Sequence, residues 1–308
     1  MTYQEILRDI EKLVNSYVEC WIKGESGIRI TRGPHVSRRT YLGNNITPCE
    51  QKYLIIAHYN LHELPLQIVR RLPVILIKTH KAQNVNRDHK YLWAWTAQII
   101  SEASREIEFF KNNGELLRQI RLLFRVNLMP GIRLASTFPE LVDFATYEFI
   151  LSACLAFPLL ERLLKTLCTE HIEIDGRVVK PFKIPSAKGL ISYDGKKKKR
   201  ISRIGHLLYL FENYYASTAL KEALKDFRLT CAEVYEEGMG PYGYYFVDHW
   251  RNILLHGEEF WPTMNAALVN LITLIILHEI PSDVYYERRE KMRENLKFQL
   301  NIGIRSPF

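Results

Sequence analysis

Apolar residues recur along most of the chain at spacings of three and four residues, which is the period of a helix with one buried face. In the first half of the chain this pattern predicts helices over 3–22, within 49–80 and over 91–128. In the second half it predicts helices over 139–169, 263–280 and 283–300, and two more within 204–236. We therefore expect a mainly α-helical protein.

Helix-breaking residues divide this pattern at Pro65, Pro73, Asn112-Asn113-Gly114 and Pro158. Pro158 lies inside the apolar stripe of 139–169, so a kink or a junction of two helices is expected there. Met129-Pro130-Gly131 predicts a turn. We place a boundary after this turn, between a mostly helical region at 1–135 and a helical domain at 136–308.

Two segments depart from the helical pattern and are rich in basic residues. Residues 23–47 contain several glycines, asparagines and arginines and predict a hairpin or an extended loop. Residues 171–203 predict an insertion with β-hairpin turns at Asp175-Gly176 and Asp194-Gly195. The second turn leads into a run of five cations, among which Lys197, Lys198 and Arg200 are candidate RNA-binding residues. Such a run attracts a phosphate backbone without sequence preference, and a solvated loop tip is the alternative.

Composition and charge fit a folded protein with a polyanionic partner. The formal net charge is +8, which favours encounter with nucleic acid, although a basic protein without that role has the same composition. The longest apolar run, 266–277, is shorter than a bilayer crossing and contains Asn270 and Thr273, so it predicts a buried core helix. The N-terminus lacks the apolar core of a signal peptide. We expect no membrane association.

The cysteines give no sign of a metal site or a disulfide framework. There are five, an odd number, and none forms a CxxC pair. We therefore expect no structural disulfide, no bound zinc and a reducing cytoplasmic location.

Candidate chemistry is concentrated in Asp248-His249-Trp250-Arg251-Asn252-Ile253-Leu254-Leu255-His256-Gly257. The planar cation of Arg251 matches a phosphate, and His256 can exchange a proton near neutral pH. Gly257 predicts a helix end after His256, where the helix dipole favours an imidazolium. Asn252 and His256 share a helix face, but Arg251 and His256 are separated by about 140°. They converge only if the helix begins or ends within the motif, or if a partner helix completes the site.

The R-N-x-x-x-H-G pattern resembles the motif of the HEPN superfamily (higher eukaryotes and prokaryotes nucleotide-binding), whose ribonuclease members carry R-x4-6-H. Residues 149–165 resemble an early helix of such domains, in which a glutamate precedes a basic residue by four, as Glu161 precedes Lys165. The resemblance covers about residues 140–300. It implies a HEPN-type helical bundle, with the basic insertion at 171–203 added to it. It also implies a homodimer with both motifs at one interface, and pairing with a regulatory or antitoxin partner.

The motif residues predict a metal-independent endoribonuclease without a cofactor. A defence or toxin-type role, growth arrest or RNA processing would each fit such an enzyme. The RNA 2′-hydroxyl is the nucleophile, and the expected products carry a 2′,3′-cyclic phosphate and a 5′-hydroxyl. We assign transition-state charge to Arg251, proton transfer or phosphate orientation to His256, and positioning to Asn252, with Glu161 in support. Of the four aromatic residues nearby, Tyr244, Tyr245, Phe246 and Trp250, most belong to the core by this interpretation, and one could stack on a base.

Other interpretations of the same residues are structural or non-catalytic. Arg251 could pair with Glu258 or Glu259, His256 could satisfy a buried carbonyl, and Glu161 could form an ordinary helix-surface ion pair with Lys165. The chain would then be a non-catalytic HEPN-like module that binds RNA or protein. A third hypothesis, a metal-dependent hydrolase, rests on the four-residue spacing of His58 and His62.

Overall fold

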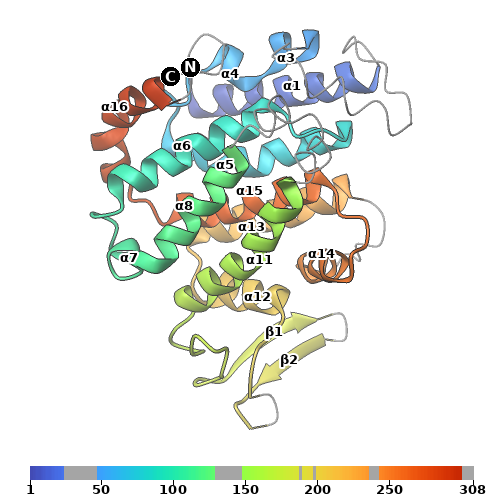
Figure 1. Ribbon diagram of the computed structural model, residues 1–308, viewed down its shortest axis with the longest axis vertical. Coiled ribbons are helices and arrows are strands. Elements are labelled where there is room, and N and C mark those ends of the chain that lie inside the picture. Colours follow the sequence, from blue (N-terminus) through green and yellow to red (C-terminus); the bar gives the residue numbers. More distant parts are fainter. Residues whose placement is uncertain (24–46, 129–147, 187–188, 197–198, 236–242, 300–308) are drawn as a thin grey trace, which may run out of the picture.

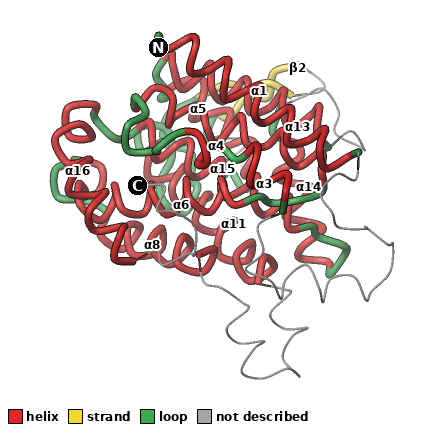
Figure 2. Tube along the Cα trace, turned by 90° about the horizontal axis from the view of Figure 1, so that it is seen from above, coloured by secondary structure: helices red, strands yellow, loops and turns green. Residues whose placement is uncertain are grey.

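The computed structural model describes residues 1–23, 47–128, 148–186, 189–196, 199–235 and 243–299, and these residues form a mainly helical protein. The basic segment 23–47 and the predicted boundary near 135 therefore lie almost wholly outside the described residues. Figure 2 shows the helices from above, with the two strands as the yellow elements. The predicted fold class, mainly α with a small β-hairpin, is confirmed at this level.

The helices of the first half follow the predicted segments closely. They are α1 (Tyr3–Ile22), α3 (Pro48–Tyr53), α4 (Ile55–His58), α5 (Leu66–Ile77), the 3₁₀ helix η1 (Lys78–Ala82), α6 (Arg87–Ala103), α7 (Glu108–Lys111) and α8 (Gly114–Leu128). Capping boxes begin α1 and α3, where Thr2 and Thr47 each accept a hydrogen bond from the backbone of the glutamate three residues later. The predicted break at Asn112-Asn113-Gly114 separates α7 from α8.

The second half contains α11 (Glu148–Leu167), α12 (Ile204–Tyr214), α13 (Thr218–Val234), α14 (Tyr245–His256), α15 (Pro262–His278) and α16 (Ser282–Gln299). Two of the expected helix breaks are absent, the one at Pro73 and the junction of two helices at Pro158. Pro73 lies inside α5, and Pro158 lies inside α11, which is one continuous helix. Both prolines sit in helices packed against α15, and this tertiary packing outweighs the local cost of a proline.

The apolar helix α15 is the centre of the core, as predicted. Every residue from Asn265 to Leu277 is buried, and α15 packs against α5, α6, α11 and α13 (Figure 1). Asn270 is accommodated because its amide donates to the carbonyl of Pro73 (3.0 Å) and its oxygen accepts from the indole of Trp93 (2.8 Å). One hydrophobic core therefore includes residues from both sides of the predicted boundary at 135.

The insertion at 171–203 contains a different hairpin from the one predicted. The turn at Asp175-Gly176 is present, with Gly176 at a φ of 85°, but Ile172 and Val178 form only an isolated bridge. The regular strands are β1 (Phe182–Ser186) and β2 (Gly189–Tyr193), which pair antiparallel from Phe182–Tyr193 to Ser186–Gly189. The hairpin packs through β1 against α12.

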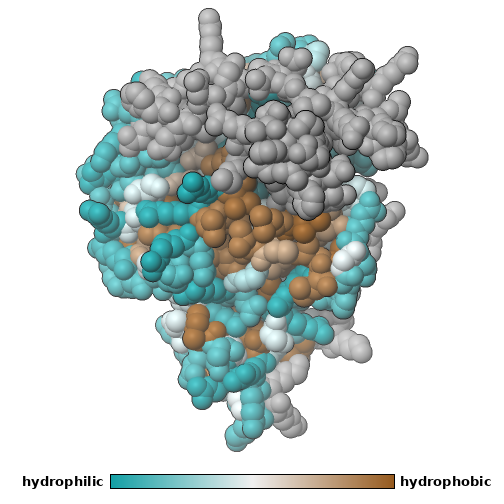
Figure 3. Space-filling model, viewed as in Figure 1, coloured by the Kyte–Doolittle hydropathy of each residue, from teal (hydrophilic) through white to brown (hydrophobic). Residues whose placement is uncertain are grey.

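Hydrophobic residues also reach the surface beside the core. Figure 3 shows a hydrophobic patch near the middle of the face seen in Figure 1, over α8 and α11. These two helices carry the exposed side chains of Leu122 and Leu151. α11 also contacts α14, the helix that carries the Arg–His motif.

The expectation of unpaired cysteines is wrong for one pair. Cys20 in α1 and Cys49 in α3 form a disulfide, while Cys154, Cys168 and Cys231 are free thiols. This bond removes the argument from cysteine usage on which the cytoplasmic prediction rested.

Within the described ranges, no single helix has the length and apolar character to cross a membrane. Helices α15 and α16, taken together as a bent pair, have the length and composition of a membrane-spanning segment.

Candidate active site on the Arg–His helix

Helix α14 carries Arg251, Asn252 and His256 and ends where the sequence predicts. Gly257 has a φ of 71°, the left-handed conformation that glycine adopts without a steric penalty. The N–H of Glu258 donates to the carbonyl of Ile253 (3.0 Å), which closes the last turn. His256 is therefore the last helical residue, and its side chain lies at the C-terminal end of the helix dipole.

A buried polar cluster fixes the beginning of α14. The hydroxyl of Tyr244 donates to one carboxylate oxygen of Glu212 (2.8 Å), and the guanidinium of Arg228 donates to the other (2.7 Å). The same guanidinium lies over the Tyr244 ring, 5.2 Å from its centroid. Three helices, α12, α13 and α14, are joined at this point.

Asp248 fixes the next turn of α14 against α12. Its carboxylate accepts a hydrogen bond from the backbone N–H of Gly205 (3.2 Å). This N–H lies in the first turn of α12, where backbone donors have no acceptor within the helix. Burial raises the pKa of Asp248 from its usual value, and the hydrogen bonds from Gly205 and Ile204 act in the opposite direction. The bond fixes the rotation of α14 relative to α12.

Arg251 lies beside an ion pair on the neighbouring helix α11. Its guanidinium is 3.7 Å from one carboxylate oxygen of Glu161, and the other oxygen is 2.8 Å from the ammonium of Lys165. The two side chains on α11 are mostly buried, and that of Arg251 is 36% exposed. Arg251 thus pairs with Glu161 rather than with Glu258 or Glu259. The Glu161–Lys165 pair exists as predicted, and it also holds the motif arginine.

Asn252 and His256 lie on a different side of α14 from Arg251. Both side chains are exposed, so His256 does not satisfy a buried carbonyl. Neither end of α14 falls between Arg251 and His256, so these side chains keep the angular separation of about 140° that a continuous helix imposes. A single copy therefore presents Arg251 toward α11 and His256 toward solvent.

The basic insertion approaches this site through Gly176. A Cβ atom built on Gly176 would lie 3.6 Å from the ammonium of Lys165, so the turn contacts the ion pair that holds Arg251. Arg200 is exposed and pairs with Asp175 in the same turn (3.0 Å), whereas Lys197 and Lys198 lie outside the described residues. The contact between Gly176 and Lys165 has no signal in the sequence, because it depends on how the insertion folds back.

The histidines considered as metal ligands do not form a site. His58 is exposed and its Nε2 lies 2.8 Å from the carbonyl oxygen of Lys52, whereas His62 is buried beside Glu63. Among the residues that the structure describes, no group of three or more His, Cys, Asp or Glu side chains could hold a metal ion.

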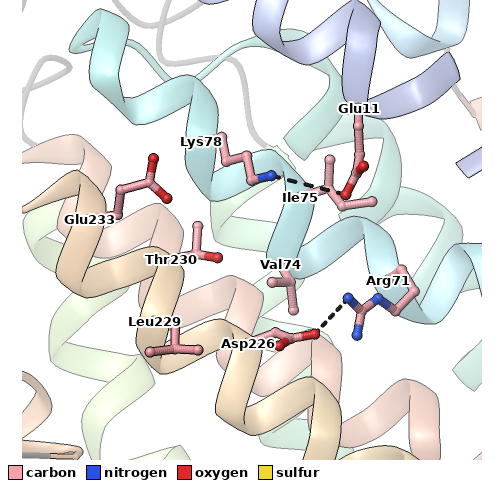
Figure 4. A pocket seen from close by; sticks show the side chains of 9 residues that line it. All are labelled: Glu11, Arg71, Val74, Ile75, Lys78, Asp226, Leu229, Thr230 and Glu233. Carbon is pink, nitrogen blue, oxygen red and sulfur yellow. Dashed lines mark hydrogen bonds and ion pairs between the residues drawn. The ribbon is translucent and has the colours of Figure 1, made fainter. Parts of the chain in front are cut away.

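A separate hollow of about 270 Å³ lies between α1, α5 and α13 (Figure 4). Four of its charged side chains pair with one another, Arg71 with Asp226 (2.7 Å) and Lys78 with Glu11 (4.0 Å). The fifth, Glu233, pairs with Lys81 outside the lining (2.6 Å). These pairs neutralise the charges that a ligand would otherwise meet, so we locate the candidate chemistry on α14.

The arrangement on α14 combines a held arginine, an exposed amide and an exposed imidazole, which are groups that can bind a phosphate and transfer a proton. In comparisons with protein-family models, with curated proteins and with solved structures, the chain matches none of them.

Proposed function

We propose that this protein is a metal-independent endoribonuclease of the HEPN type, with Arg251, Asn252 and His256 as its catalytic residues. The observation that carries the proposal is the ion pair of Arg251 with Glu161. It joins the two segments on which the HEPN resemblance rests, although they are far apart in the sequence. A role in defence or as a toxin, with a regulatory or antitoxin partner, belongs to the same proposal.

The chemistry requires little beyond these side chains, because RNA carries its own nucleophile. The 2′-hydroxyl loses its proton and attacks the adjacent phosphorus, and the bond to the 5′-oxygen breaks as that oxygen gains a proton. His256 is assigned to proton transfer or to orienting the phosphate, and Arg251 to the charge that develops on the phosphate oxygens. Asn252, on the same face as His256, positions the phosphate by hydrogen bonding.

The proposed function requires a homodimer. One copy directs these groups to different sides of α14, so a second α14 is needed to place an arginine and a histidine on one phosphate. Leu255, within the motif, is 69% exposed and would be covered in such an assembly. A twofold pair is the commonest arrangement of identical chains.

The test is cleavage of labelled single-stranded RNA by purified protein in EDTA. We expect wild-type protein to produce 2′,3′-cyclic phosphate ends, and Arg251→Ala and His256→Ala to lower the rate by roughly 100-fold or more. Matched controls are Arg118→Ala, which removes an exposed arginine of α8, and His58→Ala, which removes an exposed histidine. Equal loss in the controls, or cleavage that survives both motif changes, contradicts the proposal.

A second candidate is a non-catalytic module that binds RNA or a protein partner. The divergence of Arg251 and His256 in one copy favours it, because a single chain presents an incomplete constellation. RNA binding without cleavage by a confirmed dimer, with affinity reduced in Arg251→Ala, would support this function instead.

A further inference from the structure

Tyr245 differs from the other aromatic residues at the beginning of α14. The side chains of Tyr244, Phe246 and Trp250 are at most 3% exposed and belong to the core. Tyr245 is 56% exposed, although it lies between two of them in the sequence. Core packing therefore accounts for three of the four rings and leaves Tyr245 available to another molecule.

The ring of His249 lies next to that of Tyr245 and nearly parallel to it. The ring centroids are 6.1 Å apart, and the ring planes differ by 9°. A four-residue spacing places the two side chains one above the other on the helix surface. This contact restricts the Tyr245 ring, so less conformational freedom is lost when a flat group stacks on it.

These two rings share a face with the exposed part of the motif. Tyr245, His249, Asn252 and His256 follow one another at intervals of four, three and four residues, which keeps them in one stripe along α14. At a rise of 1.5 Å per residue, Tyr245 lies about 10 Å from Asn252 and about 16 Å from His256 along the helix axis. A strand whose phosphate is bound near Asn252 and His256 can therefore place over Tyr245 a base that lies a few nucleotides further along the strand.

The surrounding charge suits a nucleic-acid strand. The cations Arg203 and Arg251 are close enough to Asp248, one turn from Tyr245, to act on the pKa of its carboxyl in the lowering direction. Arg203 is exposed, and the whole chain carries a net charge of +8. Aromatic rings beside a cationic path are the common elements of proteins that bind single-stranded nucleic acids.

We propose that Tyr245, supported by His249, is a stacking site for one nucleobase of single-stranded RNA. The base belongs to a nucleotide a few positions along the strand from the phosphate held by Arg251, Asn252 and His256. This site rests on the proposed function and adds a substrate contact to it. Because every base has an aromatic face, the site recognises an unpaired base with little preference for its identity.

The experiment measures binding of single-stranded RNA in a His256→Ala background, so that the probe stays intact. We expect Tyr245→Ala to weaken affinity roughly 5- to 150-fold, the range found for loss of one base–aromatic stack. Tyr245→Phe should retain the affinity, whereas Tyr245→Leu, which keeps an apolar side chain without a ring, should not. Tyr3→Ala, which removes an exposed tyrosine of α1, is the matched control and should bind as the background does.

A second set of probes locates the base. Each probe carries one abasic nucleotide, moved through the sequence in turn. One position should weaken binding about as much as Tyr245→Ala does, and the two changes together should cost no more than either alone. Additive losses at every position overturn the stacking site.

Two further outcomes distinguish failure of the stacking site from failure of the proposed function. If wild-type protein neither binds nor cleaves RNA, the proposed function fails and the stacking site fails with it. If RNA is bound equally with and without the Tyr245 ring, only the stacking site is overturned. Sedimentation completes the test, because conversion of a dimer to a monomer by Tyr245→Ala would make Tyr245 a contact between copies and overturn the site.

Discussion

The carboxylate of Asp248 accepts a hydrogen bond from the backbone N–H of Gly205, and this bond joins the motif helix to the first turn of α12. The approach is close enough to require a glycine. A Cβ atom on Gly205 would lie 2.9 Å from Asp248 Oδ2 and 2.9 Å from the carbonyl oxygen of Tyr244. The carbonyl oxygen is backbone and cannot move without shifting α14.

We expect Gly205→Ala to destabilise the protein, although alanine is normally the better helix residue. The propensity gain of about 1 kcal/mol is opposed by overpacking, which typically costs about 1–3 kcal/mol. The net effect should be a lower free energy of unfolding in urea. The matched control is Gly114→Ala at the beginning of α8, where an added Cβ atom meets nothing within 4 Å. A Gly205→Ala variant at least as stable as the Gly114→Ala variant would contradict this argument.

The ion pair between Arg251 and Glu161 leads to a prediction about activity. Glu161→Gln keeps the shape of the side chain but removes the charge that holds Arg251 and Lys165. If the proposed function is right, the freed guanidinium is misplaced, and a misplacement of about 1 Å can cost up to 100-fold. We expect RNA cleavage to slow by roughly 10- to 100-fold, mainly in kcat. The melting temperature should also fall, because Lys165 loses its charged partner in a mostly buried ion pair.

A double-mutant cycle separates this positioning role from a general effect of charge. In an Arg251→Ala background, Glu161→Gln should slow cleavage no further, because the arginine that it positions is absent. Glu115→Gln, which removes the partner of Arg118 in an exposed pair on α8, is the control and should leave the rate unchanged. Additive effects of Arg251→Ala and Glu161→Gln would refute the positioning role.

The parts of this site that the sequence predicts are those set by local structure. The end of α14 follows from Gly257, and the pairing of Glu161 with Lys165 follows from a four-residue spacing on one helix. The partner of Arg251 does not follow, because Glu161 lies 90 residues earlier and the contact depends on packing between α11 and α14.

The departures from expectation in the fold have the same origin. Periodicity located the helices, but it could not show that α5 continues past Pro73 or that α11 continues past Pro158. Both helices continue because they pack against α15. An odd cysteine count gave no indication of which two would meet, and Cys20 and Cys49 meet because α1 packs against α3. Long-range contacts decided each of these features.

Two buried histidines, His80 of η1 and His89 of α6, form a hydrogen-bond chain in which the position of each proton can be assigned. Tyr235 donates to the carbonyl of Thr263 (2.8 Å), so its oxygen accepts from Nδ1 of His80 (2.6 Å). Nε2 of His80 then accepts from Nε2 of His89 (3.2 Å), and Nδ1 of His89 accepts from the amide of Asn270 (3.1 Å). Both histidines are neutral in this chain, and a second proton on either one would break it.

The hydrogen-bond chain through His80 and His89 predicts that the protein loses stability in mild acid. Burial lowers the pKa of His80 well below its usual value and lowers the pKa of His89 to about 4. In the unfolded chain both histidines titrate near pH 6.5. The stability contributed by the neutral, buried histidines is therefore fully present above that pH, and it is lost as the pH falls from about 6.5 toward 4. For His89 the loss between pH 7 and pH 5 should be about 2 kcal/mol.

Urea denaturation at a series of pH values measures this loss. Other buried groups also titrate, and burial raises the pKa of Asp88 to about 7, which acts in the opposite direction. We therefore compare how steeply the free energy of unfolding changes with pH in wild type and in His89→Gln, whose glutamine side chain cannot gain a proton. The exposed His58→Gln serves as the control and should keep the wild-type slope. Equal slopes for wild type and His89→Gln would show that His89 does not contribute.

The disulfide between Cys20 and Cys49 gives a prediction that needs no knowledge of function. The two cysteines are 29 residues apart, and a cross-link that closes a loop of this length restricts the unfolded chain by about 3–4 kcal/mol. Cys49→Ser should therefore lower the free energy of unfolding by about that amount under non-reducing conditions. Cys154→Ser, which changes an exposed free thiol, should be nearly neutral.

A thiol titration tests the disulfide directly. Under denaturing, non-reducing conditions the wild-type protein should show three titratable thiols, those of Cys154, Cys168 and Cys231. Reduction should raise the number to the five cysteines of the sequence. Five thiols before reduction would show that Cys20 and Cys49 are not joined, and Cys49→Ser should then cost only what the loss of a small buried side chain costs.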